Sequence, residues 1–323
     1  MRLITSDDII DTYIKLHQRG LSFITSKFNF NQLKRAKTAF NHNTIKTSNW
    51  WDIPSIKERW NLLVTGNKKL DFIDFTIENY LNEAQNLSML SLGSGNCETE
   101  LKFAKHKALK LITCIDISDI PLKKAKEIAD LNELDNIEFK VKNVNDFQFP
   151  IKKYDIVYFR ASLHHFKNIE SLVGLQINNS LKENGFLIID EYVGPNRLQF
   201  PKKQITAINQ ALKIIPKEYR KRFNLNLLKN KVSGSGILRM IIADPSECIE
   251  SANILPNIHK NYNTIYEANY GGNILMPVLK DIAHHFTYLT EDKELVLNKL
   301  YNFEDEYLKN NPSNFVFGIY QKK

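Results

Sequence analysis

The spacing of apolar residues divides the chain into a helical beginning, an alternating middle and a mixed end. From residue 1 to about residue 86 apolar residues recur at helical spacing. Gly20 is expected to end the first helix, and further helices are expected at 31–40 and 70–81. After residue 191 the pattern becomes mainly helical, interrupted by the breaker SGSG at 233–236. The remaining elements are expected in this order: a strand at 262–270, helix over 276–309 and a closing strand at 314–320.

Short apolar runs in the middle of the chain predict a buried sheet. The runs lie at 88–92, 111–116, 137–141, 154–159 and 186–189. Helices are expected between them, at 99–107, 121–131 and 169–181. Regular strand–helix alternation predicts a parallel sheet with helices on both faces, which places the chain in the α/β class.

An aromatic segment precedes the alternating region. Ser55 is expected to cap a helix there, with Glu58 three residues later completing a capping box. All three tryptophans of the chain lie in this segment: Trp50, Trp51 and Trp60. Packing between helices is the simpler interpretation. The alternative is that tryptophans wall a ligand pocket and that Arg59 reaches an anionic group of the ligand.

Composition and charge narrow the class of protein. The 323 residues are 43% apolar, which is enough for a sizeable core. The sequence contains no run of about 18 apolar residues, so a membrane span is not expected. Residues 1–8 turn acidic before a signal peptide could form. Cys97, Cys114 and Cys248 lie far apart without CxxC spacing, which argues against disulfides and a zinc site. We expect a cytoplasmic protein without a membrane segment or metal ligands.

The formal charge of +8 is concentrated in one segment. Residues 201–235 contain nine basic residues and one acid, so the rest of the chain is neutral. A solvated helix face explains such a segment most simply. The alternative is a surface between Lys202 and Lys231 that attracts an anionic or carrier-bound substrate, or a nucleic acid.

A turn with two glycines follows the first predicted strand. Gly93, Ser94 and Gly95 lie where a ligand could approach the backbone and the start of the next helix. Asp116 ends the second strand, at the edge where ligands of open parallel sheets bind, and its carboxylate can accept both hydroxyls of a ribose. A dinucleotide would need glycine at position 98, and Glu98 would repel its pyrophosphate. The pattern therefore favours S-adenosylmethionine, which carries no phosphate.

With these residues, 87–192 resembles the class I S-adenosylmethionine-dependent methyltransferases. Residues 90–97 (LSLGSGNC) are similar to the motif that wraps the methionine part of the cofactor. Residues 160–166 (RASLHHF) look like the motif after the fourth strand in members acting on small molecules, and 181–186 (LKENGF) like the turn before the fifth. The resemblance implies these cofactor-binding residues: Gly93, Ser94, Gly95, Asp116, Ile117, Asn143, Val144 and Arg160. Arg59 joins this set as the cation proposed above.

The chain departs from the family pattern at three positions. Ser91 replaces an acid that often precedes the first glycine, Cys97 replaces the usual third glycine, and Asn143 replaces an aspartate beside the adenine. An asparagine amide can still pair with the adenine edge. We expect Cys97 to be a small packing residue rather than a reactive thiol.

The flanks extend the resemblance to bacterial methyltransferases. Residues 191–199 (EYVGPNRLQ), 244–247 (DPSE) and the pair at 271–272 (GG) look like motifs of that group. The resemblance implies a Rossmann-like, doubly wound, mostly parallel seven-stranded sheet with an antiparallel last strand. The expected parts are a helical extension at 1–86, a cofactor-binding core at 87–192, a helical lid at 193–256 and a sheet-completing part at 257–323.

Two histidines after the fourth strand are candidates for catalysis. His164 and His165 should lie beside Glu191, which ends the neighbouring fifth strand. A histidine oriented by Glu191 would make a general base for removing a proton from the acceptor. The alternative is that one histidine caps the following helix while Glu191 anchors the lid. The expected substrate contacts are Tyr192, Arg197, Gln199, Trp50 and Trp51.

The expected reaction is methyl transfer to an oxygen or nitrogen of a small metabolite, sugar or natural-product intermediate. An RNA or DNA base methyltransferase would explain the basic segment, but the residues after the fourth strand lack the Asn/Asp-Pro-Pro-aromatic pattern of enzymes that methylate exocyclic amines. Nucleic acid is therefore not an expected partner. A cofactor-binding protein without catalysis is a further alternative, against which the intact histidines weigh. The sequence leaves the oligomeric state open, with a homodimer as one option.

Overall fold

A seven-stranded sheet forms the centre of the protein. The computed structural model describes residues 1–19 and 48–323, so the helix expected at 31–40 and the stop at Gly20 lie outside the described residues. The strand order is β3-β2-β1-β4-β5-β7-β6; the pairs from β3 to β5 are parallel, and β7 runs antiparallel to both of its neighbours, β5 and β6. This order confirms the predicted fold class. The strands are β1 (Leu87–Leu92), β2 (Leu109–Asp116), β3 (Ile137–Val141), β4 (Tyr154–Arg160), β5 (Leu181–Tyr192), β6 (Tyr262–Gly271) and β7 (Phe315–Lys322).

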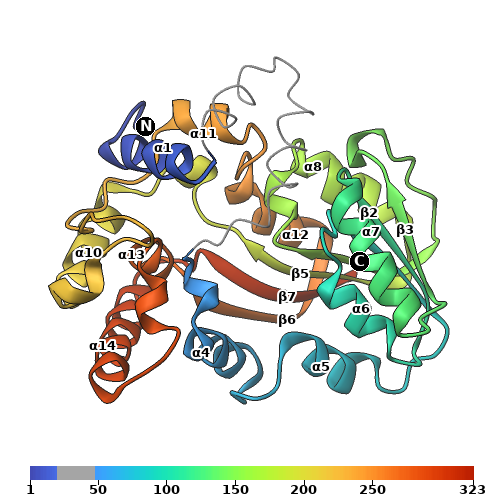
Figure 1. Ribbon diagram of the computed structural model, residues 1–323. Coiled ribbons are helices and arrows are strands. Elements are labelled where there is room, and N and C mark those ends of the chain that lie inside the picture. The colour runs from blue at the N-terminus through green and yellow to red at the C-terminus, as the bar shows by residue number, and fades with distance from the viewer. Residues whose placement is uncertain (20–47) are drawn as a thin grey trace.

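Helices cover both faces of the sheet (Figure 1). One face is packed by α4 (Pro54–Thr65), α5 (Phe72–Thr76), α6 (Glu98–Ala104) and α7 (Asp119–Leu131). The other face is packed by α8 (Ile169–Ser171), the wide turn Leu172–Ile177, α9 (Asn178–Ser180) and α12 (Ile254–Asn261). The remaining helices are α1 (Ser6–Arg19), α10 (Lys202–Leu212), α11 (Ile237–Ala243), α13 (Leu275–Leu279) and α14 (Glu291–Leu308).

The structure corrects two helix predictions. The helix α4 begins at Pro54, because proline suits the first helical position, and Ser55 does not cap it. The Ser55 hydroxyl instead lies 2.9 Å from the Tyr301 hydroxyl. The helix expected over 276–309 is broken into α13 and α14, since Asp281 has a φ of 67°, which reverses the backbone after α13.

A separate core lies beyond the carboxyl edge of β5. It joins residues from before the sheet, from the region after β5 and from the C-terminal part of the chain, including Trp50, Ile208, Val278 and Leu300. Trp50 packs edge-on against Trp60, with ring centroids 4.7 Å apart. The simpler interpretation of the tryptophans therefore holds for these two. Figure 1 shows α10, α13 and α14 grouped on this side of the molecule.

Three acids on α1 fasten this helix to the segment 233–239. The Asp7 carboxylate accepts hydrogen bonds from the backbone N–H groups of Ser233 and Gly234. Asp8 accepts from the N–H of Gly236 and from the guanidinium of Arg239. Asp11 is buried and pairs with Arg239 and Lys280. The first helix is thus held in place by charge-assisted hydrogen bonds more than by apolar packing.

The basic segment 201–235 divides into structural and exposed cations. The guanidinium of Arg222 is buried against Asp281 at 2.5 Å, and Lys229 is buried with its ammonium donating to two backbone carbonyls. The exposed cations are Lys202, Lys203, Lys213, Lys217, Lys221 and Lys231. The solvated-face interpretation therefore describes part of the segment, and structural ion pairing describes the rest.

Two expectations from composition can be compared with the structure. Cys97, Cys114 and Cys248 are all buried free thiols, which agrees with the prediction of no disulfide framework. Within residues 1–19 and 48–323, each helix is too short or too polar to span a membrane.

Removal of the Asp11 charge should weaken the attachment of α1 to the rest of the protein. Burial alone would raise the pKa of Asp11, but Lys280 and Arg239 outweigh burial and lower it from 3.8 to about 2. A carboxyl with a lowered pKa adds stability above its unfolded pKa and loses it as the pH falls through its folded pKa. Asp11→Asn should therefore lower the free energy of unfolding by about 2 kcal/mol at pH 7, measured by urea denaturation.

The control for this prediction is Asp130→Asn, because Asp130 forms an exposed ion pair with Lys126 on α7. That variant should change the free energy of unfolding by less than about 0.5 kcal/mol. The gap between Asp11→Asn and the unmodified protein should narrow as the pH falls from 3.8 towards 2. Equal losses in the two variants, or a gap that does not depend on pH, would contradict the role of Asp11.

Candidate active site

The glycine turn and the acid at the end of β2 are joined directly. Gly93 and Gly95 have φ values of 68° and 53°, which favour glycine. The N–H of Gly95 donates to one oxygen of Asp116 at 2.9 Å, and the N–H of Ser118 donates to the other at 2.7 Å. Burial raises the pKa of Asp116 despite these bonds. The structure therefore brings the predicted turn and the predicted ribose-binding acid to one edge.

The loop after β4 packs against this turn. A Cβ added to Gly93 would lie 2.7 Å from the Cβ of Ser162, so the Ser162 side chain leaves no room for a side chain at position 93. The Ser162 hydroxyl donates to the backbone carbonyl of Leu92 at 2.8 Å. By contrast, a Cβ added to Gly95 would meet nothing within 4 Å, which leaves open space beside the turn.

Glu191 holds the loop after β4 and orients His164. One oxygen of the fully buried Glu191 carboxylate accepts from the N–H groups of Ser162 and Leu163, at 2.5 and 2.6 Å. The other oxygen lies 2.7 Å from Nδ1 of His164. Glu191 is the second-last residue of β5, which pairs in parallel with β4 and so brings Glu191 close to the loop that carries His164. These contacts orient His164 and hold the loop after β4; they are not contacts with the lid region 193–256.

The two histidines differ in their electrostatic surroundings. Burial alone would lower the pKa of His164, but the adjacent Glu191 outweighs it and raises that pKa. Burial and the neighbouring His164 lower the pKa of His165. The Nδ1 atom of His165 lies 3.2 Å from the hydroxyl of Ser246. Neither histidine caps the following helix, because the carboxylate of Glu250 accepts from the N–H groups that begin α8.

The other predicted cofactor residues lie in four places. Arg160 ends β4, with its guanidinium 3.5 Å from Asp190 and 3.9 Å from Glu98, close to the glycine turn. Asn143 follows β3, and its side-chain oxygen accepts from the N–H of Asn145 in a short helical turn. Val144 is buried beside it, and Ile117 follows Asp116. Arg59 is instead engaged with α14, where it pairs with Asp305 and lies over the ring of Tyr301.

The predicted substrate residues are mostly occupied by structural contacts. The buried Tyr192 hydroxyl donates to the carbonyl of Pro195. The guanidinium of Arg197 donates to the carbonyls of Asp244, Pro245 and Glu247, and the Gln199 amide donates to the carbonyl of Ser235. Trp50 is buried in the separate core, while Trp51 is 48% exposed. The structure thus uses Arg197 and Gln199 to hold the region after β5 together.

Glu247 is the residue at this site that sequence reasoning did not select. Its carboxylate lies 3.9 Å from Nε2 of His164 and 3.9 Å from Nε2 of His165. Because Ser246 contacts His165 and Glu247 lies near both imidazoles, the 244–247 motif is part of the site. The only sequence signal was the resemblance of those four residues to a family motif, which assigned them no role.

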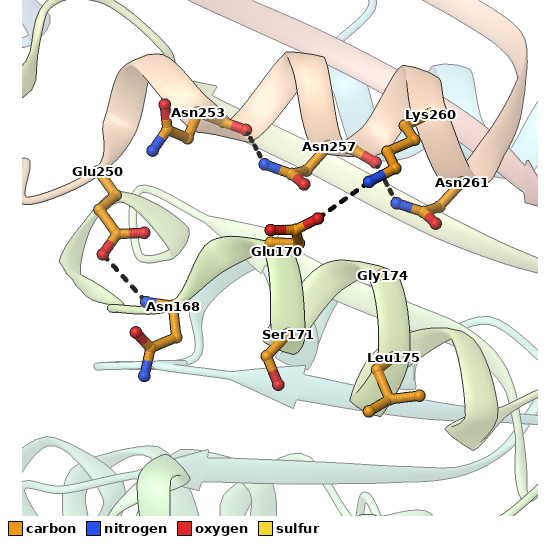
Figure 2. A pocket seen from close by; sticks show the side chains of 10 residues that line it. All are labelled: Asn168, Glu170, Ser171, Gly174, Leu175, Glu250, Asn253, Asn257, Lys260 and Asn261. Atoms are coloured by element: carbon orange, nitrogen blue, oxygen red, sulfur yellow. Dashed lines mark hydrogen bonds and ion pairs between the residues drawn. The ribbon is translucent and has the colours of Figure 1, made fainter.

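A polar pocket lies next to this site, between α8 and α12 (Figure 2). Lys260 pairs with Glu170 across the pocket at 2.9 Å, and Glu250 accepts from the backbone of Asn168. The lining residues are Asn168, Glu170, Ser171, Gly174, Leu175, Glu250, Asn253, Asn257, Lys260 and Asn261. This lining includes neither the glycine turn nor the histidines, and its ion pair fastens α12 to α8.

A sequence model described as a methyltransferase domain matches residues 83–280. The chain belongs to this methyltransferase family. The match confirms the resemblance to class I S-adenosylmethionine-dependent methyltransferases and, with it, S-adenosylmethionine as the cofactor. It covers the glycine turn, both histidines and the 244–247 motif.

Comparison with individual proteins gives more distant similarities. The uncharacterized methyltransferase YcgJ of Bacillus subtilis (strain 168) is 26% identical over 105 residues, which span 32% of this chain and 40% of that protein. Geranyl diphosphate C-methyltransferase from Streptomyces coelicolor A3(2) has a structure that aligns with a TM-score of 0.48 and 11% identity over 78% of each chain. The structure of the [4+2]-cyclase SpnF aligns with a TM-score of 0.47 and 12% identity, covering 100% of this chain and 97% of that one.

The residues of this methyltransferase fit its cofactor. The space beside Gly95 leaves the turn backbone accessible, and the Asp116 carboxylate lies at the same edge. Glu98 is exposed at the start of α6, where it would repel a pyrophosphate but tolerates a sulfonium. The charges of the turn therefore suit S-adenosylmethionine better than a dinucleotide.

Gly93→Ala tests the close approach between the turn and the β4 loop. The added methyl group would meet Ser162, and the φ of 68° is strained for alanine. We expect the free energy of unfolding to fall by about 2–3 kcal/mol, with weaker binding of S-adenosylhomocysteine by calorimetry.

Gly66→Ala is the matched control, because Gly66 has a φ of 76° but nothing within 4 Å of an added Cβ. It should cost only the backbone strain, about 1 kcal/mol, and leave cofactor binding unchanged. If the two alanines cost the same, the contact with Ser162 has no energetic role.

Proposed function

We propose that this methyltransferase moves the methyl group of S-adenosylmethionine to an oxygen or nitrogen nucleophile of a small metabolite, sugar or natural-product intermediate. The observation that supports the proposal is the pairing of His164 with Glu191 on a loop that packs against the glycine turn. A proton-accepting group and the cofactor turn thus lie at one edge of the sheet. Methyl transfer is an in-line displacement, so positioning of the two reactants supplies much of the catalysis.

The cofactor would lie across the carboxyl ends of β1, β2 and β3. In this proposal the backbone of Gly93–Gly95 faces the methionine part and Asp116 holds the ribose hydroxyls. Asn143 and Val144 flank the adenine. Arg160 lies within reach of Glu98 and Asp190, which makes it a candidate for the cofactor carboxylate.

The acceptor would lose its proton to His164. Because Nδ1 of His164 faces Glu191 at 2.7 Å, Nε2 is the atom left to face the acceptor. The bound cofactor would supply the methyl group: the acceptor atom would form a bond to the methyl carbon while the carbon–sulfur bond breaks, with its electron pair left on sulfur in S-adenosylhomocysteine. His165 is the second candidate for this role. The region after β5 would select the acceptor, because its residues 244–249 lie against both histidines.

His164→Ala tests this assignment. We expect kcat to fall by about 10²- to 10⁴-fold once an acceptor is found, because general base catalysis contributes in that range. Binding of S-adenosylhomocysteine should stay within about twofold of the unmodified protein, measured by calorimetry. Glu191→Gln should also lower kcat, and in addition it should lower stability, because Glu191 holds two backbone N–H groups.

The control is His259→Ala, because His259 is a partly exposed histidine that also pairs with a carboxylate, Glu267, at 2.6 Å. Its kcat should not change. If the His164→Ala enzyme retains full kcat, His164 is not the general base. His165→Ala would then be tested in its place.

The exposed lysines of the basic segment favour a second candidate acceptor, one that is phosphorylated or attached to a carrier, or RNA. Six exposed ammonium groups between Lys202 and Lys231 could attract such an anion. We nevertheless propose a free small molecule, because Arg222 and Lys229 in this segment are used structurally.

Charge reversal separates the two acceptors. Lys202→Glu, Lys203→Glu and Lys213→Glu together should leave kcat/KM within about twofold if the acceptor is a free neutral molecule. A loss of tenfold or more that weakens with added salt would instead favour the anionic acceptor. Retention on heparin, compared between the unmodified protein and the triple variant, would show whether nucleic acid is the anion.

A further inference from the structure

We infer that His164, His165 and Glu247 form a binding site for a divalent transition metal ion of the zinc class. One ligand atom from each residue lies within 4.8 Å of the others. Metal–nitrogen and metal–oxygen bonds at zinc are about 2.0–2.2 Å, so two ligands on one ion lie about 3–4 Å apart. The 3.9 Å separations between Glu247 and each imidazole are already close to that value.

Hydrogen bonds at Nδ1 of both histidines leave Nε2 of each ring facing Glu247. Nδ1 of His164 faces the Glu191 carboxylate, which can only accept, so this nitrogen carries the proton. The Ser246 hydroxyl donates to Asp244 at 2.5 Å, so it accepts from Nδ1 of His165. In the neutral rings both Nε2 atoms therefore have lone pairs, and both face Glu247. Carboxylate–histidine–metal arrangements of this kind fix the ligand tautomer in metal proteins.

The turn that carries Glu247 is rigidly held. Arg197 donates to three carbonyls of 244–247, and its own N–H donates to the carbonyl of Cys248 at 2.6 Å. Arg197 and Cys248 have φ values of 55° and 47°, which are strained for residues other than glycine. Such strain persists only where the surrounding contacts fix the backbone. The carboxylate is thus positioned in advance.

The charge and accessibility of the cluster also suit a cation. Glu191, Asp244 and Glu247 surround two imidazoles, so the neutral rings leave an excess of negative charge. The side chains of His164 and Glu247 are 10% and 31% exposed, which leaves the Glu247 side of the cluster open to solvent. Two histidines and one carboxylate with open positions is a ligand set used by zinc and by non-haem iron. This proposal departs from the sequence prediction of no metal.

The inference goes beyond the proposed methyl transfer, because it requires only the geometry of three side chains. Both the metal site and the proposed methyl transfer use Nε2 of His164. In metal-free protein Nε2 of His164 is available to a proton, and in metal-loaded protein it is a ligand.

Calorimetry of the full chain with Zn²⁺, after treatment with a chelator, tests the site. We expect one ion per chain and a loss of at least 100-fold in affinity in Glu247→Gln and in His165→Ala. Glu191→Gln should weaken binding by about 10- to 100-fold, as expected of a residue that orients a ligand. Co²⁺ in place of Zn²⁺ should give an absorption spectrum of a nitrogen- and oxygen-ligated ion that disappears in Glu247→Gln.

His259→Ala is the control for adventitious binding, since His259 on α12 and Glu267 on β6 form a histidine–carboxylate pair that is not part of the proposed site. It should bind Zn²⁺ with unchanged affinity at the proposed site. The absence of saturable binding, or equal binding by Glu247→Gln with the fold intact by circular dichroism, would overturn the inference. Zn²⁺ binding does not depend on finding an acceptor, so a chain that binds the ion but releases no S-adenosylhomocysteine would lose the proposed function and keep this site.

Discussion

The buried carboxylate of Glu191 is the contact on which the arrangement of the site depends. A carboxylate without solvent contact costs several kcal/mol unless its oxygens are paired. Here two backbone N–H groups and one imidazole satisfy it, all from the loop after β4. These bonds fix Ser162, whose hydroxyl in turn reaches the carbonyl of Leu92 before the glycine turn. One carboxylate therefore sets the distance between the cofactor turn and the histidines.

Two non-glycine residues, one in the loop after β4 and one beside the glycine turn, have positive φ values. Ala161, at the end of β4, has a φ of 48°, and its N–H donates to the carbonyl of Asp190 at 2.8 Å. Cys97 has a φ of 54° at the place where the family usually has a third glycine. Each such residue costs of order 1–3 kcal/mol and is kept only where other contacts fix the backbone. Position 97 thus has a backbone conformation that favours glycine although it carries a cysteine.

The sequence was informative wherever the chain follows regular periods. The strands could be predicted because buried parallel strands are continuous apolar runs, and their alternation with helices predicts a parallel sheet. The seven-stranded arrangement with an antiparallel last strand was implied by the family resemblance. The turn at Gly93–Gly95, Asp116 and the neighbourhood of His164 and Glu191 were accessible for the same reason, since they lie at the ends of those strands. Glu247 was not, because it comes from an irregular segment that is more than 50 residues beyond β5. Its place depends on Arg197 and on strained turns, which leave no periodic signal.

The same reasoning explains why polar residues near β5 were assigned to the substrate. Tyr192, Arg197 and Gln199 follow Glu191 directly, and proximity in sequence suggested proximity to the acceptor. In the structure the Arg197 guanidinium donates to three backbone carbonyls, because irregular segments must pair their backbone groups without a ladder. Whether these residues also contact the substrate stays a prediction.

The surroundings of His164, the proposed general base, are positioned by aromatic packing behind it. Tyr192 packs edge-on against Phe315 with ring centroids 5.3 Å apart, and Phe315 contacts Trp50 at 5.3 Å. His164 meets the same tyrosine, at 6.3 Å between ring centroids. This aromatic series connects the histidine to the core that α10, α13 and α14 share. Because protein cores are close-packed, a change of volume in that core would be transmitted to the ring of Tyr192 and so to the histidine beside it. In the proposed function, selection of the acceptor would therefore depend on this packing as well as on the residues that touch the acceptor.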